Sequence, residues 1–341
     1  MTFQHIKKLE LSENVNSFSK DTLRDISAEV DQINYYPDSN CSKLKELIAH
    51  SNNIGCQNVF IGNGSDEVIL STLLGLGLIN KKVVVPRNTF MGYYYACVLL
   101  NNDIVEVDLL NYCIDIRKCS ELVQNQRVRA IFICNPHNPF GTVLDFDEVF
   151  QLVKLCEMQH VYLIIDEAYV EFLNNRIDFA PYTKECHYLI VIKTFSKAYG
   201  LAGIRCGYAC ASSKIIDNLN KVKKVLPYSV NRIALKAAEI VIKDKDYLKN
   251  TINTNNAVRL WFETQLDILG VQYVKSYTNF VSIGVNNVEQ VVSYFRKESV
   301  LVKDLRNMGI NDFIRITIGT KSDMEYVLSL ISQSKQYFIS T

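Results

Sequence analysis

The chain has 341 residues, of which 48% are hydrophobic and 21% are charged, and its formal net charge is +1 at pH 7. These values are typical of a globular protein with a sizeable core, and the length suffices for two domains. A net charge so close to zero gives no electrostatic basis for binding nucleic acid or an anionic membrane. We interpret the short run of Lys221, Lys223 and Lys224 as a solvated helix face.

The ten cysteines and the N-terminal residues indicate a reducing compartment. The cysteines are scattered and none forms a C-x-x-C pair, so we expect free thiols and no disulfide framework. The first residues, MTFQHIKKLELSEN, lack the apolar centre of a signal peptide. No apolar run approaches the length of a membrane span. We therefore expect a cytosolic protein that does not enter a membrane.

Apolar runs of strand length recur through the first two-thirds of the chain. Several are rich in Val and Ile and do not alternate with polar residues, which is typical of strands buried on both faces. Helical patterns at 66–76 and 146–158 lie between them. This alternation predicts a mostly parallel sheet covered by helices. The strand-like runs are 59–61, 82–86, 104–109, 130–134, 161–165, 189–194 and 207–211.

A long helical region at about 213–265 is followed by a second set of strand and helix patterns. That set comprises 276–285, 289–299, 300–304 and 313–319, and it predicts a smaller α+β domain. We expect an N-terminal arm that belongs partly to the small domain, a large domain and a small C-terminal domain. No low-complexity linker marks the boundary near residue 250. The corresponding ranges are 1–34, 35–250 and 251–341.

Ligands of an open parallel sheet bind beyond the carboxyl ends of its strands, so the segments after the apolar runs are informative. GNGSDEV at 62–68 allows a tight turn in which Ser65 or Asp66 caps a helix, and a helix N-terminus attracts anions. The segment is neither G-x-G-x-x-G nor a P-loop, and a plain capped turn also explains it. NPHNPFG at 135–141 predicts a rigid loop that holds the Asn138 amide towards a ligand, or an ordinary turn.

DEAYVEF at 166–172 places a carboxylate at the end of an apolar strand. Asp166 is costly to desolvate there unless a cation or a hydrogen-bond donor stabilises it, although a helix N-cap is an alternative. Tyr169 follows three residues later and is a candidate for the same cleft.

KTFSKAYGLAGIR at 193–205 combines two aliphatic hydroxyls, an arginine and two lysines. Thr194, Ser196 and Arg205 form a set that suits phosphate. A lysine near other cations and away from water has a lowered pKa, so Lys197 is a candidate nucleophile able to form a Schiff base. An ordinary surface lysine is the alternative. A phosphate anchor, a buried carboxylate, a phenol, an amide and a reactive lysine together are what pyridoxal phosphate (PLP) requires.

The sequence resembles the fold type I, PLP-dependent aminotransferases, and within them the histidinol-phosphate aminotransferase branch. The resemblance rests on YYPDSNCSKLKELIA, GNGSDE, NPHNPFG, DEAYVEF, TFSKAYGLAGIRCGY and IRITIGT, which come in the family's order along nearly the whole chain. It implies an aspartate-aminotransferase-like α/β fold with a large PLP-binding domain and a smaller α+β domain. It also implies a homodimer with shared active sites and no metal ion.

The resemblance assigns a role to each candidate residue. Lys197 is expected to form the Schiff base and to move the proton between the substrate α-carbon and the cofactor C4′. Asp166 is expected to pair with the pyridinium nitrogen. The ring hydroxyl is assigned to Asn138 and Tyr169, and stacking on the ring to Tyr93. The phosphate is assigned to Thr194, Ser196, Arg205 and the backbone of Gly64, Ser65 and Asp66, with Tyr36 reaching it from the neighbouring subunit.

Four residues are expected at the substrate end of the site. Arg315 resembles the arginine that binds the substrate carboxylate, and Asn279 in TNF is expected near the same pocket. Asn16 stands where the family has a tyrosine, and Lys303 stands where the family has an arginine, in the pocket that binds the substrate phosphate. A lysine attracts phosphate as a point charge and not as a bidentate fork. We expect these two changes to weaken or relocate phosphate recognition.

A third departure lies in the cofactor loop, where His137 and Phe140 replace the family's Asn and Thr. The cofactor end is otherwise intact, so we expect an aminotransferase that takes its amino group from L-glutamate. Imidazole acetol phosphate is the default acceptor. One alternative is transfer to another small phosphorylated ketone or to a 2-oxo acid. The other is decarboxylation of a phospho-amino acid. A non-catalytic PLP-fold protein would lack Lys197 or Asp166, and a nicotinamide dehydrogenase would need G-x-G-x-x-G.

Overall fold

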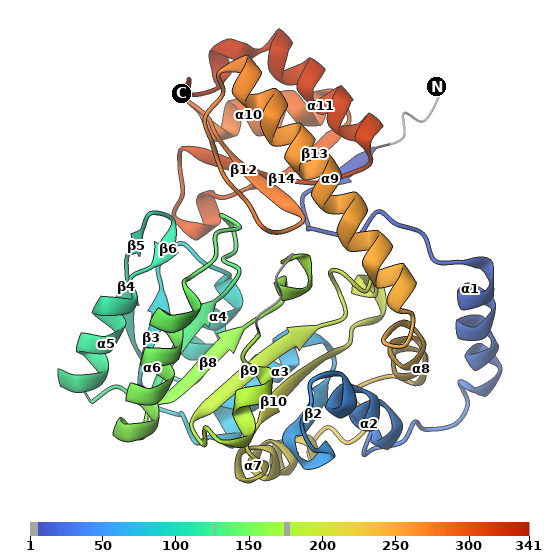
Figure 1. The fold of residues 1–341 in the computed structure, drawn as a ribbon, viewed down its shortest axis with the longest axis vertical. Coiled ribbons are helices and arrows are strands. Elements are labelled where there is room, and N and C mark those ends of the chain that lie inside the picture. The colour runs from blue at the N-terminus through green and yellow to red at the C-terminus, as the bar shows by residue number, and fades with distance from the viewer. Residues whose placement is uncertain (1–5, 126, 174–177, 341) are drawn as a thin grey trace.

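The computed structural model describes residues 6–125, 127–173 and 178–340, and it places their strands in two main sheets (Figure 1). The larger sheet lies in the lower part of the view and the smaller sheet in the upper part. The expected α/β architecture is confirmed. All seven strand-like runs of the first two-thirds of the sequence contribute to the larger sheet.

The larger sheet has seven strands in the order β2-β10-β9-β8-β7-β3-β4. Strands β3, β4, β7, β8 and β9 run parallel, whereas β10 is antiparallel to both of its neighbours, so the sheet is mostly parallel as expected. The strands are β2 (Val59–Gly62), β3 (Lys82–Pro86), β4 (Asp103–Val107), β7 (Ala130–Cys134), β8 (Tyr162–Asp166), β9 (Leu189–Thr194) and β10 (Gly207–Ala211).

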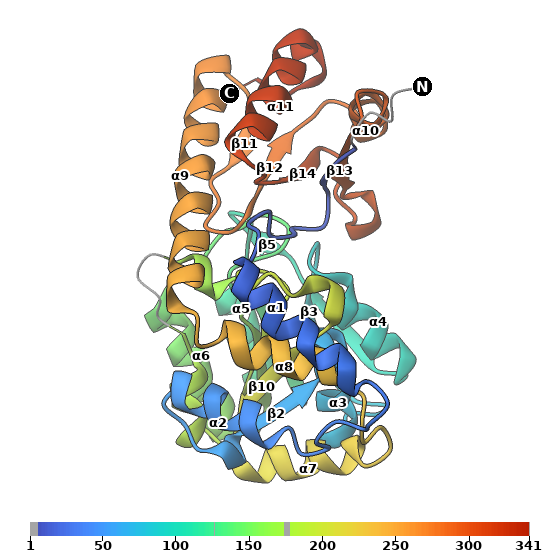
Figure 2. The same ribbon diagram turned by 90° about the vertical axis from the view of Figure 1, so that its right-hand side faces the viewer.

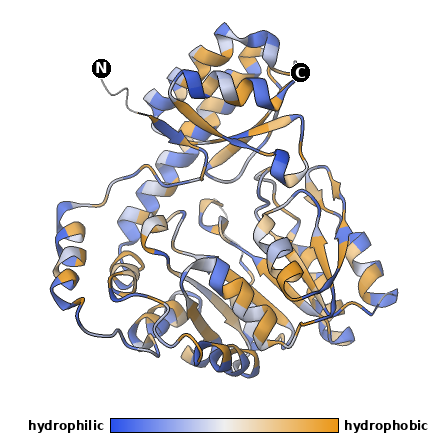
Figure 3. Cartoon of the chain, turned by 180° about the vertical axis from the view of Figure 1, so that it is seen from behind, coloured by the Kyte–Doolittle hydropathy of each residue, from blue (hydrophilic) through white to orange (hydrophobic). Residues whose placement is uncertain are grey.

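The sheet forms because both of its faces are apolar. Its strands are coloured largely as hydrophobic in Figure 3. Successive residues of a strand point to opposite faces, so Ile131 and Ile133 enter one core while Ala130 and Phe132 enter the other. The first core is shared with α2 (Ser42–Ser51), α5 (Ile116–Asn125), α6 (Phe146–Gln159) and α8 (Arg232–Val241). The second is shared with α3 (Gly64–Gly75), α4 (Met91–Leu99) and α7 (Ser213–Lys223).

The smaller sheet has five strands in the order β1-β13-β14-β12-β11. Its core contains residues of α9 (Lys245–Leu269), α10 (Val288–Lys297) and α11 (Lys321–Gln333). Helix α9 is long enough to contact both parts of the molecule (Figure 2), and residue 250 lies inside it. The strands are β1 (Lys7–Leu9), β11 (Tyr273–Val274), β12 (Phe280–Gly284), β13 (Val300–Asp304) and β14 (Phe313–Thr317).

The N-terminal segment joins the two parts of the molecule. Strand β1 pairs with β13 of the small sheet, and α1 (Lys20–Ser27) packs on α8 of the large part. A two-stranded ribbon, β5 (Leu109–Leu110) and β6 (Cys113–Ile114), completes the strands of the described residues. Short 3₁₀ helices cover Ala28–Gln32, Cys56–Asn58, Val170–Phe172, Ala180–Lys184, Ala202–Ile204, Arg306–Met308 and Lys335–Tyr337.

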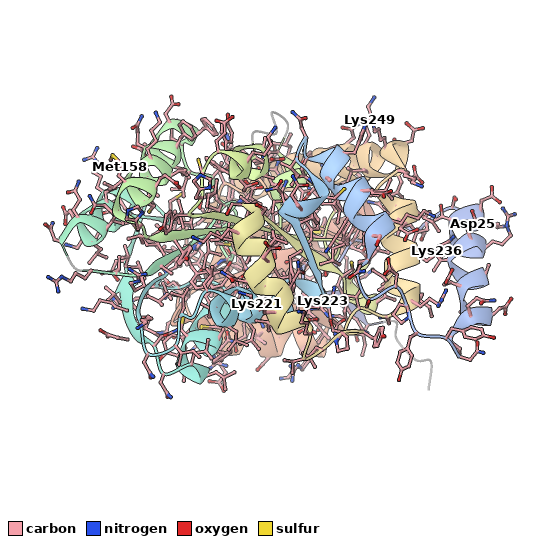
Figure 4. All side chains as sticks on the ribbon, turned by 90° about the horizontal axis from the view of Figure 1, so that it is seen from below. Asp25, Met158, Lys221, Lys223, Lys236 and Lys249 are labelled. Carbon is pink, nitrogen blue, oxygen red and sulfur yellow. The ribbon has the colours of Figure 1, made fainter. Side chains whose placement is uncertain are left out.

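Helix α7 corrects one expectation from the sequence. Lys221 and Lys223 lie on the same helix (Figure 4). Lys221 and Lys224 are exposed, but Lys223 is buried, and its Nζ donates a hydrogen bond to Ile61 O at 2.8 Å. The lysine run is therefore not a uniformly solvated face, because one turn of the helix aims its middle lysine at the end of β2. None of the ten cysteines is joined to another in a disulfide, as expected. Within the described ranges, no helix combines the length and apolarity needed to cross a bilayer.

Candidate active site

A cavity of about 370 Å³ lies where the carboxyl ends of the large sheet's strands meet the small sheet. Parallel strands bring their carboxyl ends to one edge, so the loops after β7, β8 and β9 converge there, although they are far apart in sequence. Most of the residues expected in the site line it. They are Ser65, Asp66, Tyr93, Asn138, Asp166, Tyr169, Thr194, Ser196, Lys197, Arg205, Lys303 and Arg315.

Asp166 is the buried carboxylate of the cavity, with 4% of its surface exposed. Its Oδ2 accepts a hydrogen bond from Tyr93 Oη at 2.6 Å, and its Oδ1 accepts one from the Ala168 backbone N–H at 3.0 Å. Burial raises the pKa of Asp166 to about 6 against the opposing effect of these two donors. A cation facing Asp166 in the cavity would therefore hold the carboxylate ionised.

Lys197 projects into the same cavity from the loop after β9. Its Nζ donates a hydrogen bond to Leu11 O at 2.7 Å and lies 5.6 Å from the centre of the Tyr169 ring. Burial, and then the positive charge of Arg315, lower the pKa of Lys197 to about 7. At neutral pH a large fraction of this amine is therefore unprotonated and nucleophilic.

The opposite end of the cavity is suited to an anion. Arg205 Nη2 lies 2.7 Å from Asp66 Oδ2, and Arg205 Nη1 donates to Ser196 Oγ at 3.3 Å. Thr194 Oγ1 donates to Ser196 Oγ at 3.0 Å. Gly64 has φ +81°, and a Cβ there would lie 2.5 Å from Arg205 Nη2, so the start of α3 approaches the guanidinium closely because residue 64 has no side chain.

Two cations of the small sheet face the cavity side by side. Lys303 on β13 pairs in register with Arg315 on β14, so both side chains lie on the same face of the sheet. Like charges opposite each other are destabilising unless an anion lies between them. Arg315 Nη1 donates to Asn138 Oδ1 at 2.5 Å and Nη2 donates to Glu10 O at 2.8 Å, which ties this arginine to the cofactor loop and to the N-terminal segment.

Four expected site residues are not among those that line this cavity. Gly64 does not line the cavity but abuts Arg205. Asn16 and Asn279 line a second cavity of about 170 Å³ between the N-terminal segment, α9 and the start of α11. Asn279 Nδ2 donates there to Ser12 O at 3.0 Å. Tyr36 is 78% exposed and stacks on Tyr228, with ring centres 4.5 Å apart.

Tyr93, for which the sequence predicts stacking on the cofactor ring, lines the cavity and also belongs to the core of the large sheet. Its side chain is fully buried, and its ring is stacked on Phe132 with centres 4.9 Å apart. Phe90, one helical turn earlier, also lines the cavity. The sequence TFMGYYYA offers four aromatic rings, and only the start of α4 decides which of them faces the site.

Sequence reasoning also missed Leu11, Glu13 and Met308, which line the substrate end of the cavity. The family's N-terminal motif drew attention to residue 16, whereas the hydrogen bonds of the segment to Lys197 and Arg315 bring residues 10–13 over the site. Glu13 could have been identified from the sequence, because it is the charged residue of the SENVN motif at 12–16.

The family model for aminotransferases of class I and II matches residues 6–331. The chain belongs to this family. It is 32% identical over 335 residues to the histidinol-phosphate aminotransferase of Caldicellulosiruptor saccharolyticus, which covers 96% of this chain and 91% of that protein. The function expected from the sequence, PLP-dependent amino transfer, is thereby confirmed at the level of the reaction class.

Solved structures share the fold of this aminotransferase. The histidinol-phosphate aminotransferase of Clostridium acetobutylicum superposes with a TM-score of 0.89 at 23% identity, covering 97% of this chain and 99% of that one. The L-threonine-O-3-phosphate decarboxylase of Porphyromonas gingivalis gives 0.85 at 18% identity, covering 97% and 100%. The fold alone therefore does not separate amino transfer from decarboxylation.

The cavity of this aminotransferase fits PLP. One end offers the Lys197 amine, the floor offers the Asp166 carboxylate, and the other end offers the Arg205 guanidinium with the Thr194 and Ser196 hydroxyls. These are an amine for an aldehyde, an anion for a pyridinium nitrogen and a cation for a phosphate. The donor set therefore agrees with the cofactor that the family uses.

Proposed function

We propose that this aminotransferase moves an amino group from L-glutamate to a phosphorylated carbonyl acceptor, with histidinol-phosphate:2-oxoglutarate transamination as the specific reaction. The observation that carries the proposal is the pair of cations, Arg315 and Lys303, on one face of the small sheet above the cavity. Two cations suit both substrates, because glutamate has two carboxylates and the phosphate of a phosphorylated amino alcohol carries nearly two negative charges at neutral pH. The name of the C. saccharolyticus relative supports the same substrate.

PLP, when bound, supplies an electron-withdrawing ring that stabilises negative charge at the substrate α-carbon. Lys197 would hold the cofactor, and Asp166 would pair with its ring nitrogen. Asn138 and Tyr169 would bind its ring hydroxyl, and Arg205 with the hydroxyls of the lysine loop would bind its phosphate. Phe90, which lines the cavity, is the aromatic side chain that we propose for stacking on the ring.

The proton transfer is assigned to Lys197. With a pKa of about 7, the Lys197 amine would be able to take up a proton from the substrate α-carbon and to deliver it towards the bound cofactor at neutral pH. Burial raises the pKa of Tyr169 to about 12, so its phenol stays a hydrogen-bond donor beside Lys197 and does not compete for this proton.

Arg315 would bind the carboxylate of glutamate with its two terminal nitrogens. Lys303 would bind the second anionic group. Glu13 also lines this end and carries the opposite charge, which favours substrates with a hydrogen-bond donor or a cation beside the phosphate, such as an imidazole. Asn16 lies on the second cavity, so the phosphate would depend mainly on Lys303.

The acceptor is tested by absorbance spectra of the PLP-loaded enzyme with L-glutamate and L-histidinol phosphate added separately. If both convert the cofactor to its amino form, the proposed reaction holds. If only L-glutamate does so, the acceptor is another phosphorylated ketone or 2-oxo acid. Release of carbon dioxide from a phospho-amino acid would instead assign decarboxylation, which the shared fold allows.

We also propose a homodimer with shared active sites, located in the cytoplasm, where ten cysteines would stay reduced. Tyr36 is exposed, and it is not among the residues that line the cavity of its own chain, so its expected contact with the cofactor phosphate requires a second subunit. Mixing the inactive variants Tyr36→Phe and Lys197→Ala should restore part of the activity through hybrid dimers. Exchange of subunits without any recovery would contradict the shared site.

A further inference from the structure

The hydroxyl of Tyr93 is held against the carboxylate of Asp166. Tyr93 lies in the first turn of α4, and its Oη is 2.6 Å from Asp166 Oδ2. The ring cannot shift easily, because Phe132 is stacked on it and Phe90 packs against it edge-on, with ring centres 5.4 Å apart. The donor is therefore fixed at one oxygen of the carboxylate.

The second oxygen of Asp166 is fixed as well. The Ala168 N–H donates to Oδ1 at 3.0 Å, so the two donors orient the carboxylate from both sides. Asp166 also lines the cavity, so its carboxylate can accept a further hydrogen bond from a group bound there. Hydrogen bonds of this kind favour the ionised form of a carboxyl group against the cost of its burial.

The phenol of Tyr93 remains a donor at any physiological pH. Burial, and then the negative charge of Asp166, raise the pKa of Tyr93 well above its usual value. Burial alone pushes the pKa of Asp166 upward, and the Tyr93 hydroxyl is the largest effect in the opposite direction. Without this donor, Asp166 would compete more strongly for a proton shared with a basic group in the cavity.

We propose that Tyr93 is a positioning residue that keeps Asp166 ionised and aligned, so that the ring nitrogen of the bound cofactor holds its proton during turnover. Tyr93 acts through Asp166, whereas a stacking residue would act through its ring face. The proton on the ring nitrogen makes the cofactor an effective electron sink, so loss of the hydroxyl should lower kcat more than it raises KM.

The test is Tyr93→Phe, which keeps the ring and removes only the hydroxyl. The holoenzyme is loaded with PLP carrying ¹⁵N at the ring nitrogen, and the ¹⁵N chemical shift is followed from pH 6 to pH 9. We expect the protonated fraction of the ring nitrogen to fall, with the equilibrium shifted about tenfold, as for the loss of one hydrogen bond to a charged group. Tyr94→Phe, at an exposed position of the same helix, should leave the titration unchanged.

The variant Phe132→Leu distinguishes the proposed role of the Tyr93 hydroxyl from a purely structural role of its ring. It loosens the packing of Tyr93 but keeps the hydroxyl. If Phe132→Leu and Tyr93→Phe shift the ¹⁵N titration equally, or if Tyr93→Phe does not shift it, the proposal is overturned. A readout without cofactor covers the case in which Tyr93→Phe no longer binds PLP. The ¹³C-labelled carboxyl of Asp166 in the cofactor-free protein should then titrate about one pH unit higher than in the wild type, and an unchanged midpoint overturns the proposal.

Discussion

The Lys197 amine allows a quantitative test of the site without any cofactor. Burial and the positive charge of Arg315 lower its pKa from 10.5 to about 7. At pH 7.5 about three-quarters of the amine is then unprotonated, against about one molecule in a thousand for an ordinary lysine. The reactive fraction therefore differs by nearly three orders of magnitude between Lys197 and a typical surface lysine.

Competitive acetylation of the cofactor-free protein, read by peptide mass spectrometry between pH 6 and pH 11, gives the titration of each lysine separately. Lys118 is the matched control, because its hydrogen bond to Glu121 raises its pKa above 10.5. We expect the acetylation of Lys197 to reach a plateau above about pH 8, while that of Lys118 is still rising at pH 10.

Removing the neighbouring charge should shift this titration. Arg315→Met leaves the burial of Lys197 largely in place but deletes the second-largest cause of its low pKa, so the midpoint should move upward. The reasoning is refuted if wild-type Lys197 titrates within about one pH unit of Lys118, or if Arg315→Met lowers the midpoint.

Two further predictions concern stability. His137 is buried, neither of its ring nitrogens has a partner among the described residues, and burial lowers its pKa to about 3. In the unfolded chain this imidazole binds a proton near pH 6.5, whereas in the folded chain it stays neutral down to about pH 3. His137 should therefore lower the free energy of unfolding by up to about 1.4 kcal/mol per pH unit as the pH falls from 6 to 4. His137→Asn should remove that pH dependence, and an equal pH dependence of the two proteins in urea denaturation would contradict the account. Lys193 is fully buried, with its Nζ 3.0 Å from Asp178 Oδ2 and 3.3 Å from Glu167 Oε2. Lys193→Met should lower the free energy of unfolding by about 3–5 kcal/mol, because it removes a buried cation that lies against the buried Glu167 and the half-buried Asp178. Lys118→Met, at a solvent-exposed ion pair, should have a much smaller effect. Equal losses for the two variants in chemical denaturation would refute this.

The sequence by itself determined the strands of the large sheet and the chemistry that follows them. Apolar runs such as AIFIC and LIVIKT can be recognised locally, because a strand buried on both faces is apolar along its whole length. Each strand-like run is followed within four residues by its site residue, so Asn138, Asp166 and Lys197 could be placed near strand ends. The topology rule then brings them to one edge of the sheet. These predictions needed no knowledge of distant contacts.

Only the tertiary structure decided the order of the strands, the antiparallel direction of β10 and the residues that close the substrate end. Glu13 and Leu11 enter the cavity because the N-terminal segment is tied to side chains about 190 and 300 residues away, Lys197 and Arg315, while Asn16 is carried into the second cavity. Tyr93 and Phe90 look equivalent in sequence, and the direction in which α4 leaves its loop sends one hydroxyl to Asp166. Local patterns record burial and turns, but the direction of a side chain across a cavity depends on packing between segments that the sequence does not place together.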